Sequence, residues 1–263
     1  MDLFNLKALA IAFLILVPLE RLLPLHPDQK IFRRAFALDL IYALINGIII
    51  KAMLVLLMAV TMVSLGQLIP SALSEAVAAQ LLWLQVSEII LIADVGFYFA
   101  HRAFHAVPLL WRFHAVHHSI EDLDWLAAHR VHFLDQSMTK AASLLPVALI
   151  GFQIEAIGLW ALIFYAHGLL LHANLRMRIG PLRWLIASPQ FHHWHHANEP
   201  STYNRNFAGQ LSFLDMIFGT LHLPGDKVPE CYGIDDPVAG NYLQQTIQPF
   251  LPENSANVVA RKA

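Results

Sequence analysis

The chain has 263 residues and a formal net charge of −2, and 57% of its residues are hydrophobic while only 14% are charged. With a mean hydropathy of +0.53, this balance indicates an integral membrane protein rather than a soluble domain. It also excludes a nucleic-acid-binding protein, which needs a basic face. The single cysteine, Cys231, excludes an intramolecular disulfide and a thiolate cluster, so nitrogen or oxygen atoms must hold any metal.

Three apolar segments in the first hundred residues are candidate membrane spans. Residues 3–19 would cover about 25 Å as a helix, slightly short of a hydrocarbon core, so we expect a thin or partial span there. Residues 36–66 form the most secure transmembrane helix, because the stretch from Ala52 to Ser74 carries no charge. After a turn that begins at Gly66, residues 77–100 make the third predicted span.

The next apolar region, residues 141–175, contains a single charged residue, Glu155. As one helix it would be about 52 Å long, well beyond the thickness of a bilayer core. It would also place the histidines before and after it on opposite sides of the membrane. We therefore predict a membrane hairpin that turns near Gly151 to Gln153 and spans about 141–172.

The basic residues predict the orientation of this multi-pass protein. All of the Lys and Arg residues except Lys7 and Lys51 fall on one side of the predicted topology, and the link from Gly66 to Gln80 has none. Because loops rich in Lys and Arg stay in the cytoplasm, we expect the histidine motifs to face the cytoplasm.

The histidines are concentrated in one part of the chain, since thirteen of the fifteen lie between residues 101 and 196. On a helix, His101 and His105 share a face with Asp94, and the spacing of His114, His117 and His118 directs three imidazoles to a common point. The same spacing recurs at residues 192, 195 and 196. Imidazole is the commonest protein metal ligand, so this density predicts a metal site and the duplication suggests two ions.

Ten histidines are predicted as metal ligands: His101, His105, His114, His117, His118, His132, His172, His192, His195 and His196. Asp94 and Asn174 are predicted as catalytic-site residues, because each could accept a hydrogen bond from a ligand histidine and fix its tautomer. His129, His167 and His193 are left outside the predicted ligand set.

The motifs HRAFH, WRFHAVHHS and SPQFHHWHH resemble those of the fatty acid hydroxylase/sterol desaturase superfamily of membrane di-iron oxygenases, over roughly residues 90–224. The sequence departs from the family where Phe-Leu-Asp135 follows His132 in place of the Pro and Glu of many members. It departs again where Leu214 replaces a usual Trp before Asp215.

The resemblance implies an all-α integral membrane helical bundle with a cytosolic histidine-rich cap that holds two iron ions. It further implies hydroxylation or desaturation of a C–H bond in a fatty acyl, sterol or ether lipid, with O₂ as co-substrate. The lipid would come from the bilayer. Because the sequence contains no G-x-G-x-x-G motif, we expect the electrons to come from an external donor or reductase.

The predicted organisation has three parts: transmembrane helices in residues 1–92, a catalytic domain that includes the hairpin in residues 93–224, and a polar tail in residues 225–263. Two other functions compete. A metal-dependent membrane lipid hydrolase usually has three ligands and a general-base carboxylate, as in H-E-x-x-H, which this sequence lacks. A metal transporter should place its ligands at mid-bilayer, whereas these motifs fall mostly outside the apolar segments.

Overall fold

The computed structural model describes residues 6–252. Residues 1–5 and 253–263 lie outside the described part, and with them the start of the predicted span 3–19 and the end of the predicted polar tail. Within residues 6–252 the chain is helical and contains no strand, only two isolated β-bridges. The α-helices are α1 (Leu6–Leu22), α2 (Phe36–Leu65), α3 (Ser71–Ala78), α4 (Leu82–Ala106), α5 (Pro108–His118), α6 (Phe133–Ile150), α7 (Ile154–His172), α8 (Pro189–His195), α9 (Phe213–Ile217) and α10 (Tyr242–Ile247).

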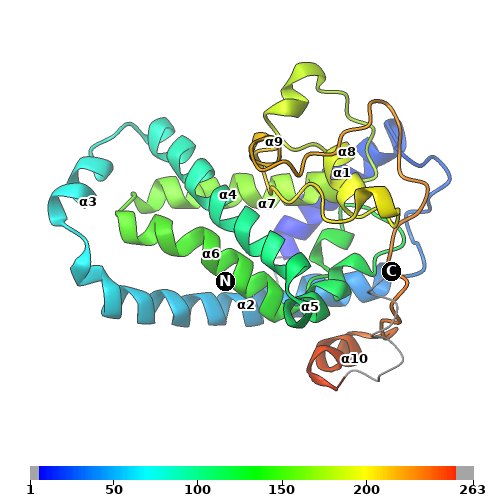
Figure 1. Cartoon of the computed structure of the whole chain (residues 1–263), viewed down its shortest axis with the longest axis horizontal. Coiled ribbons are helices and arrows are strands. Elements are labelled where there is room, and N and C mark those ends of the chain that lie inside the picture. Colours follow the sequence, from blue (N-terminus) through cyan, green and yellow to red (C-terminus); the bar gives the residue numbers. More distant parts are fainter. Residues whose placement is uncertain (1–5, 253–263) are drawn as a thin grey trace.

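Four long helices, α2, α4, α6 and α7, form an elongated stalk (Figure 1). The short helix α3 lies at one end of the stalk, and α5, α8 and α9 lie at the other. The helices alternate in direction, so α4 and α7 both end near α5 and α8. An apolar core that includes Ile89, Val147 and Trp160 holds α4, α6 and α7 together.

Three helical segments are long and apolar enough to cross a membrane, namely Phe36–Leu68, Leu82–Ala106 and Ile154–His172. The predicted helix at 36–66 is confirmed. The predicted span at 77–100 is placed too early, because α3 ends at Ala78 and α4 begins only at Leu82. The predicted segment 3–19 is not among the three candidates. Its described part belongs to α1, which packs one face against Trp125 and Leu169.

The predicted hairpin is present, since α6 ends at Ile150 and α7 begins at Ile154. Gly151 makes the turn with a φ of 97°, a conformation that favours glycine. A Cβ atom there would also lie 2.6 Å from the Cβ of Ser74. Only the second arm is a candidate span, because α6 carries Asp135 and Lys140 in its first half.

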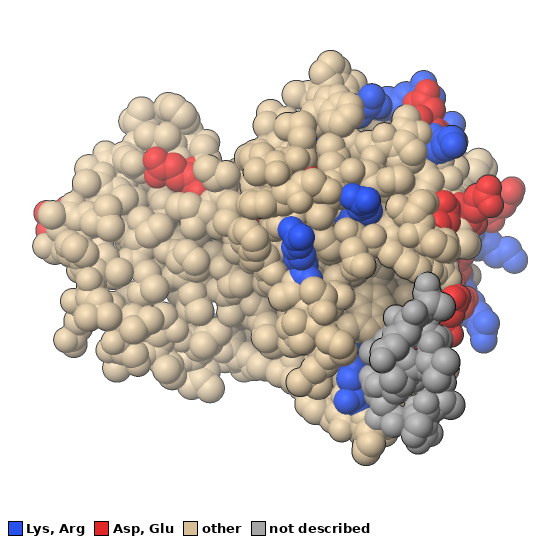
Figure 2. All heavy atoms as spheres, in the orientation of Figure 1, with Lys and Arg blue, Asp and Glu red and all other residues tan. Residues whose placement is uncertain are grey.

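The two ends of the stalk differ in the charged residues on their surface. Figure 2 shows that the visible Lys and Arg side chains lie over the end that contains α5, α8 and α9, while the α3 end shows only acidic residues and a broad uncharged surface. Exposed residues on the stalk include Val55, Leu56 and Val63, which are each at least 66% exposed. Such a surface is stable in contact with lipid rather than water.

A buried network of four charges joins the start of α2 to the segment after α5. Arg33 forms a two-pronged contact with Asp124, at 2.8 and 2.6 Å, and lies 2.6 Å from Asp39. Asp39 also accepts a hydrogen bond from Arg130. Two cations and two anions balance in this buried cluster, so the chain of ion pairs fixes the backbone around Arg130.

Gly96 allows α4 and α6 to approach closely, since a Cβ atom on it would lie 2.2 Å from the carbonyl oxygen of Ala142. Gly96→Ala should therefore force the two helices apart and lower the free energy of unfolding by about 1–3 kcal/mol. Gly158→Ala on α7 is the matched control, because nothing lies within 4 Å of its Cβ position. Thermal unfolding in detergent should show a lower midpoint for Gly96→Ala alone. Equal midpoints for the two variants would contradict the close packing.

Candidate dimetal centre

The structure brings nine of the ten predicted ligand histidines together in two neighbouring groups. The five-histidine group contains His101, His105, His114, His118 and His195, and the four-histidine group contains His117, His172, His192 and His196. Within each group, the candidate ligand atoms lie within 4.8 Å of one another. Eight of the nine side chains are buried, and His105 is half-buried.

The two copies of the H-x-x-H-H pattern are used in opposite ways. From α5, His114 and His118 join the five-histidine group while His117 turns to the other. From the α8 region, His192 and His196 join the four-histidine group while His195 turns to the first. Residues four apart lie on one helix face and the third imidazole projects sideways, so each motif contributes to both groups.

Backbone carbonyls set the tautomers of the rings. The Nδ1–H groups of His101, His117 and His195 donate to the carbonyl oxygens of Phe207, Arg130 and Arg205, at 2.8, 3.0 and 2.8 Å. His172 Nδ1 donates in the same way to Gly168, at 2.8 Å. A carbonyl oxygen only accepts, so Nδ1 must carry the proton. In a neutral ring, the lone pair is then on Nε2.

These Nε2 atoms face one another at short distances. His117 and His172 approach to 3.3 Å between their Nε2 atoms, and His172 and His192 approach to 3.0 Å. In the other group, His118 and His195 are 3.0 Å apart at Nε2. Where both rings carry their proton on Nδ1, as in His117 and His172, two lone pairs meet and no hydrogen bond can form.

A cation between the rings resolves this conflict. Two nitrogens bound at about 2.1 Å and at right angles around one ion lie roughly 3.0 Å apart, which matches the observed spacing. In addition, His105 Nε2 is buried and has no hydrogen-bond partner among the described residues. The donor set therefore fits two metal ions, one in each group.

Burial keeps the rings in the form that binds metal. It lowers the pKa of His117, His118 and His195 well below the ordinary value for histidine. The pKa of His192 and His196 is lowered for the same reason. These imidazoles are therefore neutral at physiological pH, as a metal ligand must be.

The loop that holds the rings of His101 and His195 is itself fixed by two carboxylates. Asp94 accepts hydrogen bonds from the backbone N–H groups of Gly209, Gln210 and Leu211, at 2.9, 3.0 and 2.7 Å. Asp215 accepts from the N–H groups of Phe207 and Ala208, at 2.7 and 2.9 Å. Phe207 is thus held next to His101, the residue to which its carbonyl oxygen bonds.

Asp94 and Asn174, the predicted catalytic-site residues, contact backbone rather than ligand rings. Asn174 accepts a hydrogen bond from the N–H of His26, at 2.7 Å, and donates to the carbonyl oxygen of the same residue, at 3.0 Å. Among the described residues, neither side chain is hydrogen-bonded to an imidazole of the two groups. The structure therefore assigns Asp94 and Asn174 the position of residues that fix the surrounding chain.

His132, the tenth predicted ligand, lies in neither group. Its Nδ1 accepts from the N–H of Leu134 as the N-cap of α6, and its Nε2 lies 3.0 Å from the carbonyl oxygen of Thr246.

Asp135, three residues after His132, has a role that was not predicted from the sequence. Its carboxylate lies 2.7 Å from His114 Nδ1. The only available signal was its place in the same motif, three residues after His132.

The remaining histidines make hydrogen bonds outside the two groups. His167 Nε2 bonds to the carbonyl oxygen of Ala187, and His129 lies beside Leu126 and Tyr165. His193 is hydrogen-bonded to the hydroxyl of Tyr232 at 2.7 Å, and the same hydroxyl bonds to His26. This bridge ties the back of α8 to the link between α1 and α2.

Comparisons with known proteins cover the same part of the chain. The family model described as fatty acid hydroxylase matches residues 86–220. An ornithine lipid hydroxylase of Rhizobium tropici is 36% identical over 174 residues, which are 66% of this chain and 52% of that protein. Human alkylglycerol monooxygenase is 33% identical over 146 residues, 55% of this chain and 32% of the relative.

A very-long-chain aldehyde decarbonylase of Oryza sativa subsp. indica is 26% identical over 138 residues, 52% of each chain. The chain thus spans about half of the length of the first and last of these relatives and about a third of the human one. No solved structure matches the chain.

Metal content distinguishes the ligands from the capping histidine. His172→Ala removes one of four nitrogens from its group and should reduce the bound transition metal from about two ions per chain to about one. His132→Gln, in which the amide oxygen can still cap α6, should retain both ions. Elemental analysis after reconstitution provides the measurement. Loss of metal in His132→Gln but not in His172→Ala would contradict the assignment.

Asp94→Asn tests the support of the loop. An amide has one acceptor oxygen where three N–H groups need acceptors, so the loop should lose about 1–3 kcal/mol of stabilisation. The carbonyl of Phe207 would then hold His101 less firmly. We expect a lower unfolding midpoint and weaker metal retention during dialysis against a chelator. Glu88→Gln, on the same helix, is the control, because Glu88 accepts a hydrogen bond from Gln80 rather than from the loop. If the unfolding midpoint and the metal retention of Asp94→Asn equal those of Glu88→Gln, Asp94 does not support the site.

Proposed function

Because the chain belongs to the fatty acid hydroxylase family, we propose that it is a membrane-bound di-iron oxygenase that hydroxylates or desaturates a lipid. The observation that carries the proposal is the pair of adjacent histidine groups at the end of an apolar helical stalk. The names of the relatives, a lipid hydroxylase and a monooxygenase among them, support oxidation rather than the hydrolysis considered as an alternative.

Iron is the metal that the family implies, and imidazole nitrogen suits iron as well as zinc, copper and nickel. Two bound iron ions would supply the activation of O₂ that oxidation of an unactivated C–H bond requires. We propose the nine clustered histidines as the ligands and leave His132 out. The four-histidine group has fewer protein ligands, and a catalytic metal needs open positions, so we expect the exchangeable positions to lie there.

The chain's own residues prepare the site for that chemistry. Burial keeps His117, His192 and His196 neutral, and the buried carbonyl oxygen of Arg130 holds the ring of His117 in one orientation. Eight of the nine clustered side chains are buried, which would keep bulk water away from bound ions. A lipid can reach such a site directly from the bilayer, because α4 and α7 carry ligands at the ends of apolar spans.

We further propose that the histidine end faces the cytoplasm, with the catalytic unit in residues 93–224. The distribution of Lys and Arg supports this orientation. A separate electron donor is part of the proposal, since residues 1–263 contain no G-x-G-x-x-G motif for a nicotinamide or flavin nucleotide.

The reaction is tested by lipid profiling of cells that express wild type, His195→Ala or His222→Ala under ¹⁸O₂. His222 lies outside both groups, so its variant controls for the loss of an imidazole. Label should enter one lipid class with wild type and His222→Ala, whereas His195→Ala should show no turnover. Paired loss of two hydrogens without label would indicate desaturation. Release of fatty acid from a lipid ester without O₂ would replace the oxygenase by a hydrolase.

A further inference from the structure

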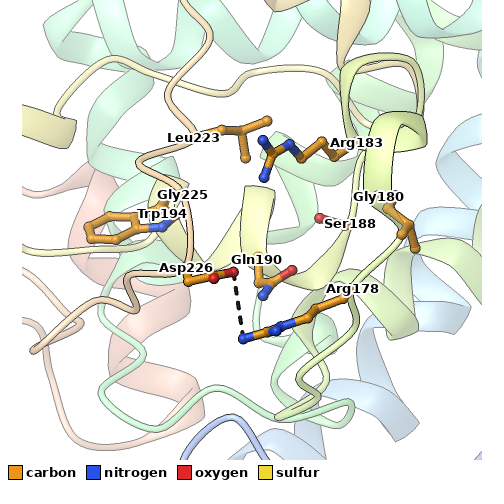
Figure 3. Close-up of a pocket in the computed structure, with 10 residues that line it drawn as sticks. Arg178, Gly180, Arg183, Ser188, Gln190, Trp194, Leu223, Gly225 and Asp226 are labelled. Carbon is orange, nitrogen blue, oxygen red and sulfur yellow. Dashed lines mark ion pairs between the residues drawn. The ribbon is translucent and has the colours of Figure 1, made fainter.

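A cavity lies behind α8, away from the histidine groups. It has a volume of about 170 Å³, which leaves room for a group much larger than a water molecule. Figure 3 shows how its polar side chains surround the space. The residues that matter for the argument are Arg178, Arg183, Ser188, Gln190, Trp194 and Asp226.

The cavity and the candidate dimetal centre use opposite faces of one helix. Gln190 and Trp194, four residues apart on α8, line the cavity. His192 lies between them and is about 200° away around the helix axis, where it joins the four-histidine group. A ligand in the cavity would therefore touch α8 without touching the metals.

Arg183 is the group that points to an anionic ligand. Its Nε atom is buried and has no hydrogen-bond partner among the described residues. Its guanidinium lies 5.2 Å from the ring centre of Trp184, which holds the side chain in place. An unpaired charged donor in a buried position is costly unless an acceptor is present.

A second arginine lies across the cavity. Arg178 is 3.6 Å from the carboxylate of Asp226, and these side chains are 66% and 76% exposed. Ion pairs with this exposure are weak, so an anion can compete with Asp226 for Arg178. The lining residues carry two positive charges and one negative charge, which leaves a net attraction for an anion.

The surroundings of the cavity indicate where that anion comes from. Arg178 comes six residues after His172, the last residue of a candidate span. Beside Arg183, the side chains of Leu182, Trp184 and Leu185 are 54%, 44% and 49% exposed. Exposed Trp and Leu next to Arg are typical of segments at the level of lipid headgroups.

We propose that this cavity binds the phosphate group of a membrane lipid, with Arg183 and Arg178 on the phosphate oxygens. Arginine suits this role because its planar fork matches the geometry of phosphate. The acyl chains of the lipid lie along the exposed apolar residues of the segment from 182 to 186. The site is independent of the oxidation reaction and places a lipid against the helix that carries ligands for both metals.

The test is equilibrium binding to the full-length, metal-loaded protein in detergent, with three probes: dihexanoyl phosphatidate, inorganic phosphate and dihexanoylglycerol. Dihexanoyl phosphatidate should bind most tightly, inorganic phosphate weakly and dihexanoylglycerol least. Arg183→Gln should weaken phosphatidate binding about tenfold, and Asp226→Asn should strengthen it. Arg176→Gln is the matched control, because it removes the same charge from an exposed residue outside the cavity. Metal content should be equal in all four proteins, which shows that the variants fold.

Three results would overturn the proposal. If Arg183→Gln and Arg176→Gln weaken binding equally, the cavity is not the site. If dihexanoylglycerol binds as tightly as phosphatidate, the phosphate group is not recognised. If inorganic phosphate binds as tightly as phosphatidate and competes with it, the site takes free phosphate from water and the lipid assignment is wrong.

Discussion

The structure depends on one electrostatic constraint, the convergence of nine imidazoles in two groups, in which the lone pairs of His117 and His172 face each other. Without a cation, the Nε2 atoms of His117 and His172, which are 3.3 Å apart, repel each other. Ordinary side-chain packing does not hold rings in such an arrangement. For His101, His117, His172 and His195 the chain does so by binding Nδ1 to a fixed backbone carbonyl, so that the Nε2 atoms of these rings are left for a ligand.

The buried charges of the protein support that arrangement indirectly. The ion pairs of Arg33, Asp39 and Asp124 lie beside Arg130, whose carbonyl oxygen orients His117. Likewise, Asp94 fixes the loop whose Phe207 carbonyl orients His101. In both cases the charge holds backbone and the backbone holds the ring. This keeps carboxylates away from most ligand nitrogens, with Asp135 as the exception.

Helical periodicity and segment length predicted much of this architecture from sequence, including the α6–α7 hairpin and the face of α4 that carries His101 and His105. The prediction that His114, His117 and His118 point to one place is wrong, because His117 turns to the four-histidine group. The division of the histidines into groups of five and four could not be predicted, because it depends on how α5 and α8 meet. The roles of Asp94 and His132 could also not be predicted from the sequence. Both contact backbone that is more than a hundred residues away, and the positions of backbone N–H and carbonyl groups cannot be read from a sequence.

Because the α8 region contributes ligands to both groups, the order of synthesis limits when either group can bind metal. This helix supplies His195 to one group and His192 and His196, at its end, to the other. When synthesis of α5 ends at His118, more than seventy residues must still be translated before the first of these three exists. Neither group can be filled early, and neither can be filled much before its neighbour. On the proposal of two bound ions, we therefore expect metal loading as a late step of biogenesis, after His196 has been synthesised.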